Sequence, residues 1–185
     1  MPRFVLSNQN IFSVEQLCEQ ARAKHIAGDT AEAIGLLTKA IQQEPSNTQV
    51  AMDMVQIFID IGELEQATAL FNQLPALDRE GDTGTALLGQ LTIHELAAKT
   101  DGKEALQARI SNANDNEARF DLAICLVAEH DYQEAMENLF AVIKSEPEFK
   151  EGAAREMIVS LCNILEPNEP ELSQKFRRRL ANTLA

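Results

Sequence analysis

This sequence is poor in basic charge and contains no long apolar run. Its 29 acidic residues outnumber 16 basic ones, which gives a formal net charge of −13. Nucleic acids and anionic membrane surfaces are bound through basic clusters, so this balance argues against both partners. No apolar run reaches the roughly 20 residues that a membrane-spanning helix needs, and the first ten residues lack the features of a secretory signal. We therefore expect a soluble, cytoplasmic protein.

Paired cysteines are also missing. Cys18, Cys125 and Cys162 stand far apart, and no CxxC pair exists to make a dithiol redox motif or a zinc knuckle. Each cysteine lies in an apolar, helix-like segment. We expect all three thiols to be buried as small apolar side chains.

Catalytic patterns are absent as well. His25, His94 and His130 stand singly, and the His-Glu-Leu of residues 94–96 lacks the second histidine of a HExxH zinc site. There is no GxSxG, no GxGxxG and no P-loop. We expect no enzyme activity, no cofactor and no metal site.

What the sequence does contain is a repeat with a period of 34 residues. Gly28 precedes Gly62 by 34 residues, and His130 follows Gly62 by twice that distance. Multiples of the same period relate three alanines and two prolines: Ala33, Ala67 and Ala135, and Pro45 and Pro147. This is the length of the tetratricopeptide repeat, in which each unit is a helix, a tight turn and a second helix.

The recurring residues suit such a unit. Glycine adopts the left-handed conformation that ends a first helix, so Gly28 and Gly62 mark turns and His130 takes the same place in its unit. The alanines fit where paired helices cross closely. The prolines end the second helices, because proline cannot continue a helix.

We place the units at about residues 14–47, 48–81, 82–115 and 116–149, after an N-terminal extension of residues 1–13. The third unit is degenerate, with a late turn near 100–102 and a short second helix over about 103–111. A further helix pair, residues 150–185, is expected to cover the open apolar end of the array. Its two predicted apolar stripes are Ala154, Met157, Ile158, Leu161, Ile164 and Leu165, and then Leu172, Phe176, Leu180 and Leu184. The fold class predicted is all-α, a tetratricopeptide-like solenoid of helical hairpins with a C-terminal capping helix pair.

The helix predicted over 49–61 is apolar nearly all round. Its only polar stripe is Gln49, Asp53, Gln56 and Asp60. Either neighbouring helices cover the apolar residues, or these residues form an apolar groove for a peptide or an unfolded segment. Because first helices line the concave groove of tetratricopeptide arrays, candidate partner contacts are Met52, Ile59, Phe120, Ile124 and Val127.

One type of groove is excluded. Some tetratricopeptide proteins clamp the C-terminal carboxylate of a chaperone with Lys and Asn at positions 5 and 9 of the first unit. Here Cys18 and Arg22 occupy those positions. We therefore expect no carboxylate clamp.

From Asn116 onward the sequence resembles the chaperedoxins, bacterial co-chaperones in which a thioredoxin-like domain precedes tetratricopeptide repeats. The marks are Phe-Asp-Leu-Ala at 120–123, the stretch 132–139, Gly-Ala-Ala-Arg at 152–155 and Phe-Arg-Arg-Arg-Leu-Ala at 176–181. The resemblance covers about residues 14–185 and implies holding of unfolded clients and transfer to a chaperonin or DnaK-type foldase. No thioredoxin-like domain is present, so we expect an excised fragment or a chain that lacks this domain, without thiol exchange.

Three adjacent arginines, Arg177, Arg178 and Arg179, stand out in this acidic chain. If Phe176 is buried, Arg177 and Arg178 point away from the apolar stripe and Arg179 flanks it. The arginines either stabilise the final helix and pair with acidic neighbours, or form a cationic docking face for an acidic foldase surface. The function expected is a protein-interaction module of a co-chaperone; the alternative is a structural adaptor for a specific partner, without a chaperone role.

Overall fold

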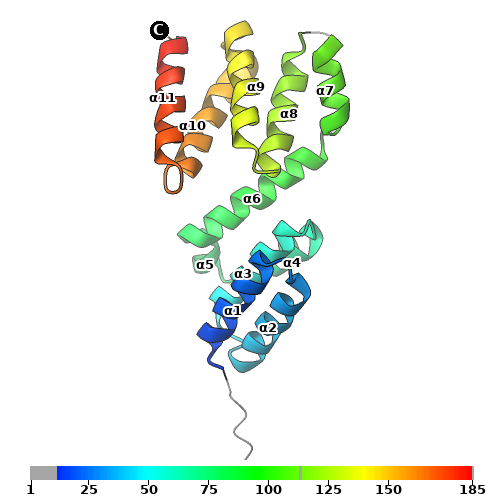
Figure 1. Ribbon diagram of the computed structural model, residues 1–185, viewed down its shortest axis with the longest axis vertical. Coiled ribbons are helices and arrows are strands. Elements are labelled where there is room, and N and C mark those ends of the chain that lie inside the picture. Colours follow the sequence, from blue (N-terminus) through cyan, green and yellow to red (C-terminus); the bar gives the residue numbers. More distant parts are fainter. Residues whose placement is uncertain (1–11, 113, 185) are drawn as a thin grey trace, which may run out of the picture. The chain divides into compact units, whose positions relative to one another are not determined.

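The computed structural model describes residues 12–112 and 114–184, without the side chain of Asn112. Residues 1–11 of the N-terminal extension predicted over 1–13 therefore lie outside the described residues. Within the described ranges there are eleven α-helices, one short 3-10 turn and no strand (Figure 1). The all-α class predicted from the sequence is confirmed.

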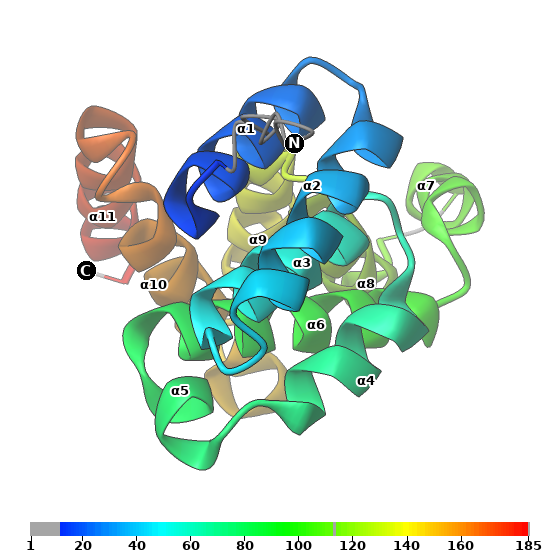
Figure 2. The ribbon, with the colours of Figure 1, turned by 90° about the horizontal axis from the view of Figure 1, so that it is seen from below.

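The chain divides into two compact units, Met1–Leu91 and Thr92–Ala185, and the boundary falls inside one helix. The helices of the first unit are α1 (Val14–Ile26), α2 (Thr30–Gln43), α3 (Thr48–Asp60), α4 (Leu64–Gln73), α5 (Ala76–Glu80) and the first part of α6 (Asp82–Ala98). α1 and α2 form one antiparallel hairpin, α3 and α4 form the next, and α2 packs on α3 (Figure 2). Ala33 and Ala67, where helices were expected to cross closely, are fully buried.

The second unit contains the end of α6 and two further hairpins. Its remaining helices are α7 (Lys103–Asn112), α8 (Asn116–Ala128), α9 (Tyr132–Ser145), α10 (Ala153–Leu165) and α11 (Pro170–Leu184), with the 3-10 turn Phe149–Gly152 between α9 and α10. α8 pairs with α9 and α10 with α11, while α9 packs on both α10 and α11. α7 is present where a short helix was expected, and its closest packing is with α8.

Three hairpin turns repeat one hydrogen-bond pattern at the spacing of the sequence period. Gly28, Gly62 and His130 have φ of 87°, 78° and 62°. In each turn the following residue donates its N–H to a carbonyl five residues earlier, at 2.8–2.9 Å. This is the Schellman ending of a helix, which requires a left-handed residue. The prediction that His130 serves as a turn residue is confirmed.

Substitution of two glycines of the first hairpin by alanine should change the stability of the protein in opposite directions. Gly35 lies in the middle of α2 and Gly28 lies in the turn. A Cβ added at either position would have no neighbouring atom within 4 Å. Gly35→Ala should stabilise the protein by about 0.5–1 kcal/mol, since alanine loses less backbone entropy in a helix. Gly28→Ala should destabilise it by about 1 kcal/mol, because its φ is positive. Urea denaturation followed by circular dichroism measures both, and shifts of equal sign would contradict this explanation.

The helix expected from residue 150 begins at Ala153 instead. Residues 150–152 have φ of 45°, 60° and 88°, so the chain makes a left-handed turn before α10. A left-handed conformation costs about 1–2 kcal/mol for each non-glycine residue. The ammonium of Lys150 lies 5.4 and 5.3 Å from the ring centroids of Phe120 and Phe149, and this attraction offsets part of the cost.

Candidate protein-interaction site

The five apolar groove candidates lie in the cores of the two units. All are at most 9% exposed: Met52, Ile59, Phe120, Ile124 and Val127. Met52 and Ile59 pack in a cluster with residues of α4 and α6, and the other three belong to the core of the second unit. The sequence left two interpretations open, and this burial favours the one in which neighbouring helices cover the five side chains. Their role as partner contacts stays a prediction.

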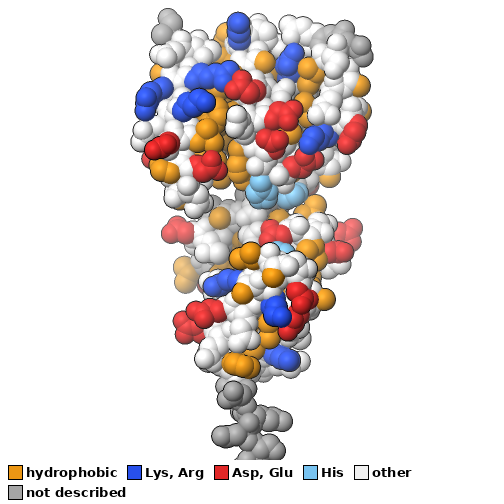
Figure 3. All heavy atoms as spheres, in the orientation of Figure 1, with side chains coloured by type: hydrophobic (Ala, Val, Ile, Leu, Met, Phe, Trp, Pro, Cys, Tyr) orange, Lys and Arg blue, Asp and Glu red, His pale blue; other side chains and the backbone are white. Residues whose placement is uncertain are grey.

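Helix α11 presents the basic cluster on the outside of the second unit. Phe176 anchors it, since this side chain is 2% exposed and its ring centroid lies 6.2 Å from that of Phe140 on α9. Ser173 is also buried and donates its Oγ–H to the carbonyl of Cys162 on α10, at 2.8 Å. Leu184, expected in the buried stripe, is 48% exposed because it lies in the last turn. Lys and Arg side chains gather over α11 (Figure 3).

Arg177 stabilises the α10–α11 hairpin. Its Nη2 donates to Oε2 of Glu166 at 2.9 Å and to Oδ1 of Asn163 at 2.6 Å. Both acceptors lie at the end of α10 or just after it. Arg177 therefore fits the structural interpretation of the arginine run.

Arg179 joins α11 to α9. Its two terminal nitrogens donate to the two carboxylate oxygens of Glu137, at 2.5 and 2.9 Å, and its guanidinium lies 4.1 Å from the ring centroid of Phe140. Such a forked, stacked geometry is the strong form of an arginine–carboxylate pair. The pKa of the Glu137 carboxyl is lowered mainly by the hydrogen bond from Arg179. The charges of Arg179 and Lys175 lower it less strongly.

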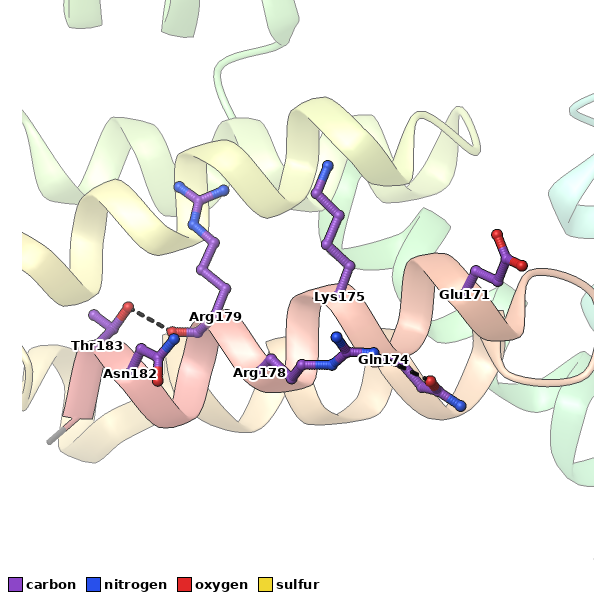
Figure 4. A pocket seen from close by; sticks show the side chains of 7 residues that line it. All are labelled: Glu171, Gln174, Lys175, Arg178, Arg179, Asn182 and Thr183. Carbon is purple, nitrogen blue, oxygen red and sulfur yellow. Dashed lines mark hydrogen bonds between the residues drawn. The ribbon is translucent and has the colours of Figure 1, made fainter.

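Arg178 and Lys175 are the cations of α11 that remain available to a partner. Among the described residues, Arg178 donates only a long 3.4 Å hydrogen bond to Gln174, and Lys175 makes no ion pair. Both line an open depression along the outer face of α11 (Figure 4). The remaining lining residues are Glu171, Gln174, Arg179, Asn182 and Thr183.

Lys175 is a residue that sequence reasoning missed. The signal was present, since residues three apart on a helix share a face and Lys175 precedes Arg178 by three. Consecutive residues on a helix point in different directions, so the three adjacent arginines do not share one face. Arg178 and Lys175 line the same depression on α11, and Arg177 is not among its lining residues.

Groups for other kinds of chemistry are buried or dispersed. The three cysteines are buried, as predicted, and burial raises the pKa of the Cys18 and Cys162 thiols. In the part of the chain that the structure describes, no cluster of three or more His, Cys, Asp or Glu residues could hold a metal ion. None of the described helices combines the length and apolar character that crossing a membrane would require.

Comparison with known proteins agrees with the helical hairpins. Two family models described as tetratricopeptide repeat match residues 96–184 and 25–91. The chain contains a tetratricopeptide repeat region. Such repeats are typically a non-enzymatic, protein-interacting fold, and neither match indicates a catalytic family.

Two further similarities extend over most of the tetratricopeptide region. A Haemophilus influenzae protein described as uncharacterized is 28% identical over 153 residues, which are 82% of this chain and 70% of the relative. A crystallised domain of a Vibrio parahaemolyticus protein of unknown function is 21% identical and covers 91% of this chain and 98% of its own, with a TM-score of 0.42. This last likeness is too low to support any conclusion.

Proposed function

We propose that the tetratricopeptide region is the docking module of a co-chaperone, and that the outer face of α11 binds an acidic surface of a chaperonin or DnaK-type foldase. The observation that carries the proposal is the pair Lys175 and Arg178. Both are exposed, both line the same depression on α11, and neither forms an ion pair with a described carboxylate, although the charge of Lys175 also acts on Glu137. Because these foldases are cytoplasmic, the protein is proposed to act in the cytoplasm.

The chemistry of this face suits docking better than client holding. Exposed cations steer an acidic partner and select its orientation, and they contribute more to association rate than to final affinity. Holding unfolded clients requires exposed apolar surface, whereas the five apolar candidates are covered. Docking is therefore the part of the co-chaperone role that the geometry supports.

The same burial favours one alternative, a structural adaptor. The five apolar candidates are packed away and do not form the open groove that varied unfolded clients would need, so a specific partner suits the region better. An adaptor and a foldase-docking module differ in their partner, so direct binding separates them.

Charge reversal on α11 tests the proposal. The variant Lys175→Glu with Arg178→Glu should bind the foldase about tenfold more weakly, since two attractive charges become repulsive. Its melting temperature should barely change, because both side chains are exposed and unpaired. Biolayer interferometry against purified chaperonin and DnaK-type foldase gives the affinity, and calorimetry gives the melting temperature.

The matched control is Lys39→Glu with Lys144→Glu. These two lysines are also exposed but lie on α2 and α9, and they change the net charge equally. Equal weakening by both double variants would show a general charge effect and refute the α11 site. If the unaltered protein binds neither foldase, the co-chaperone proposal fails and the adaptor alternative is preferred.

A further inference from the structure

Helix α6 is apolar on more sides than its packing within the chain uses. Leu87 and Leu91 belong to a core cluster of the first unit, together with residues of α3 and α4. Ile93 and Ala97 pack against the core of the second unit. A third side of this continuous helix presents five exposed, uncharged residues, which we call the α6 seam: Thr85, Leu88, Gly89, Thr92 and Leu96. A helix that is apolar nearly all round is buried on several sides or offers a surface to a partner.

The seam coincides with a side of the first helix that the other hairpins cover. Leu88 and Gly89 are the seventh and eighth residues of the third predicted unit. Leu88 is 49% exposed, whereas its counterparts Met54 and Leu122 are at most 8% exposed. The counterparts of the exposed Gly89 are fully buried: Ala21, Val55 and Ala123. In those hairpins the second helix packs on the first, but α7, which follows α6, packs on α8. The seam is therefore a helix-packing surface that stays exposed.

The spacing of the seam suits another helix as its occupant. Thr85, Gly89, Thr92 and Leu96 follow one another at intervals of four, three and four residues. This alternation is the spacing by which two helices pack along their length in a coiled coil. An extended segment or a loop would not match a period of 3.5 residues. The expected occupant is thus a helix with an uncharged seam of the same spacing.

A second copy of α6 meets this requirement. In an antiparallel pair centred on the middle of the helix, Thr85 of one copy faces Leu96 of the other, and Gly89 faces Thr92. Each contact occurs twice, as a two-fold symmetric interface requires. Gly89 has no side chain, so the two backbones can approach closely at this point. The seam is therefore complementary to itself.

The charges at the two ends of α6 select the same antiparallel register. With the centre that aligns the seams, Asp82 at the start of α6 faces Lys99, the residue after its end. Asp82 is exposed and makes no ion pair with any described residue, and Lys99 pairs with Glu95 of its own helix at 2.7 Å. Antiparallel packing also places the positive end of each helix dipole beside the negative end of the other. We propose that two copies of this chain associate through antiparallel packing of their α6 seams.

Sedimentation equilibrium of the 185-residue chain tests the proposal. The mass should rise from one chain to two with a dissociation constant of about 10–100 µM, because a single helix pair gives a small interface. Leu88→Glu with Leu96→Glu should weaken this association at least tenfold, to about 1 mM or beyond, since carboxylates enter a seam that excludes water. The melting temperature of the dilute variant should barely change, because both leucines are exposed.

The matched control is Ile26→Glu with Ile164→Glu. These isoleucines are also exposed, lie on α1 and α10, and change the net charge equally. The control should associate as the unaltered chain does, and equal loss in both double variants would refute the α6 site. An unaltered chain that stays monomeric up to about 1 mM would overturn the proposal, because even a small specific interface associates below that concentration.

Charge exchange at Asp82 and Lys99 tests the register. Asp82→Lys alone, or Lys99→Glu alone, should weaken association about fivefold, because both end pairs become repulsive. The double variant Asp82→Lys with Lys99→Glu should regain the original affinity, since opposite charges face each other again. A parallel pair would instead place each residue opposite itself. No loss in the single variants, or no recovery in the double variant, would overturn the proposal.

Self-association through α6 is independent of the function proposed for α11. Lys175→Glu with Arg178→Glu should leave the dissociation constant of the dimer unchanged, because neither residue belongs to the seam. Conversely, Leu88→Glu with Leu96→Glu should leave binding of a foldase to α11 intact. Failure of one proposal is therefore distinguishable from failure of the other.

Discussion

Replacing Phe176 with alanine should lower the free energy of unfolding of the second unit by about 3–5 kcal/mol. This ring is 2% exposed, stacks on Phe140 and belongs to the core formed by α8, α9 and α10. Its removal leaves a cavity at the point where α11 attaches to α9. Urea denaturation followed by circular dichroism measures the loss, which is among the largest that a single substitution causes.

The control for Phe176 is Leu184→Ala in the same helix. Leu184 is 48% exposed, so its truncation should cost less than about 1 kcal/mol. Similar losses at the two positions would mean that Phe176 does not anchor α11. The Phe176→Ala variant should also lose the bidentate contact of Arg179 with Glu137 if α11 detaches, and the pKa of Glu137 should then rise toward its ordinary value.

Replacing Gly84 with alanine should destabilise the first unit by about 3 kcal/mol. Gly84 lies in the first turn of α6 and is buried against α5. A Cβ at this position would overlap the carbonyl oxygen of Asp78 and lie 2.5 Å from that of Arg79. Both obstacles are backbone atoms, so α5 as a whole must move to relieve the overlap.

Gly89→Ala, in the same helix, isolates the steric effect. An added Cβ there meets no atom within 4 Å, and the substitution should stabilise the protein by about 0.5–1 kcal/mol. Urea midpoints of the two variants should therefore move in opposite directions. Stabilisation by Gly84→Ala would show that α5 does not pack closely on α6.

The regular part of the fold was predictable because it is encoded by local geometry. The turns at Gly28, Gly62 and His130 each need one left-handed residue, and the period of 34 follows from their repetition. Helices α3 and α7 lie within one residue of their predicted bounds, since α3 ends just before the left-handed Gly62 and α7 begins just after the left-handed Gly102. Local conformation depends mostly on neighbouring residues, which is why a single sequence reveals it.

Two local features were missed. The short helix α5 follows Pro75, a residue that favours helix starts, but its five residues are too few to show a helical period. The left-handed turn at 150–152 opposes the intrinsic preference of Lys150, and the two phenylalanine rings near its ammonium are contributed by α8 and by residue 149 itself. Local propensity was overridden by contacts that only the fold creates.

By itself, the sequence determined the all-α class, the helical hairpins, the burial of the cysteines and of Phe176, and the acidic character that disfavours nucleic acid. Only the tertiary structure decided which surfaces are open. It covered Met52 and Phe120, paired Arg177 and Arg179 with carboxylates of other segments, and left Lys175 and Arg178 exposed. The physical reason is that helical periodicity specifies which residues share a face, whereas exposure and ion pairing depend on side chains that the fold brings from distant positions, such as Glu137, 42 residues before Arg179.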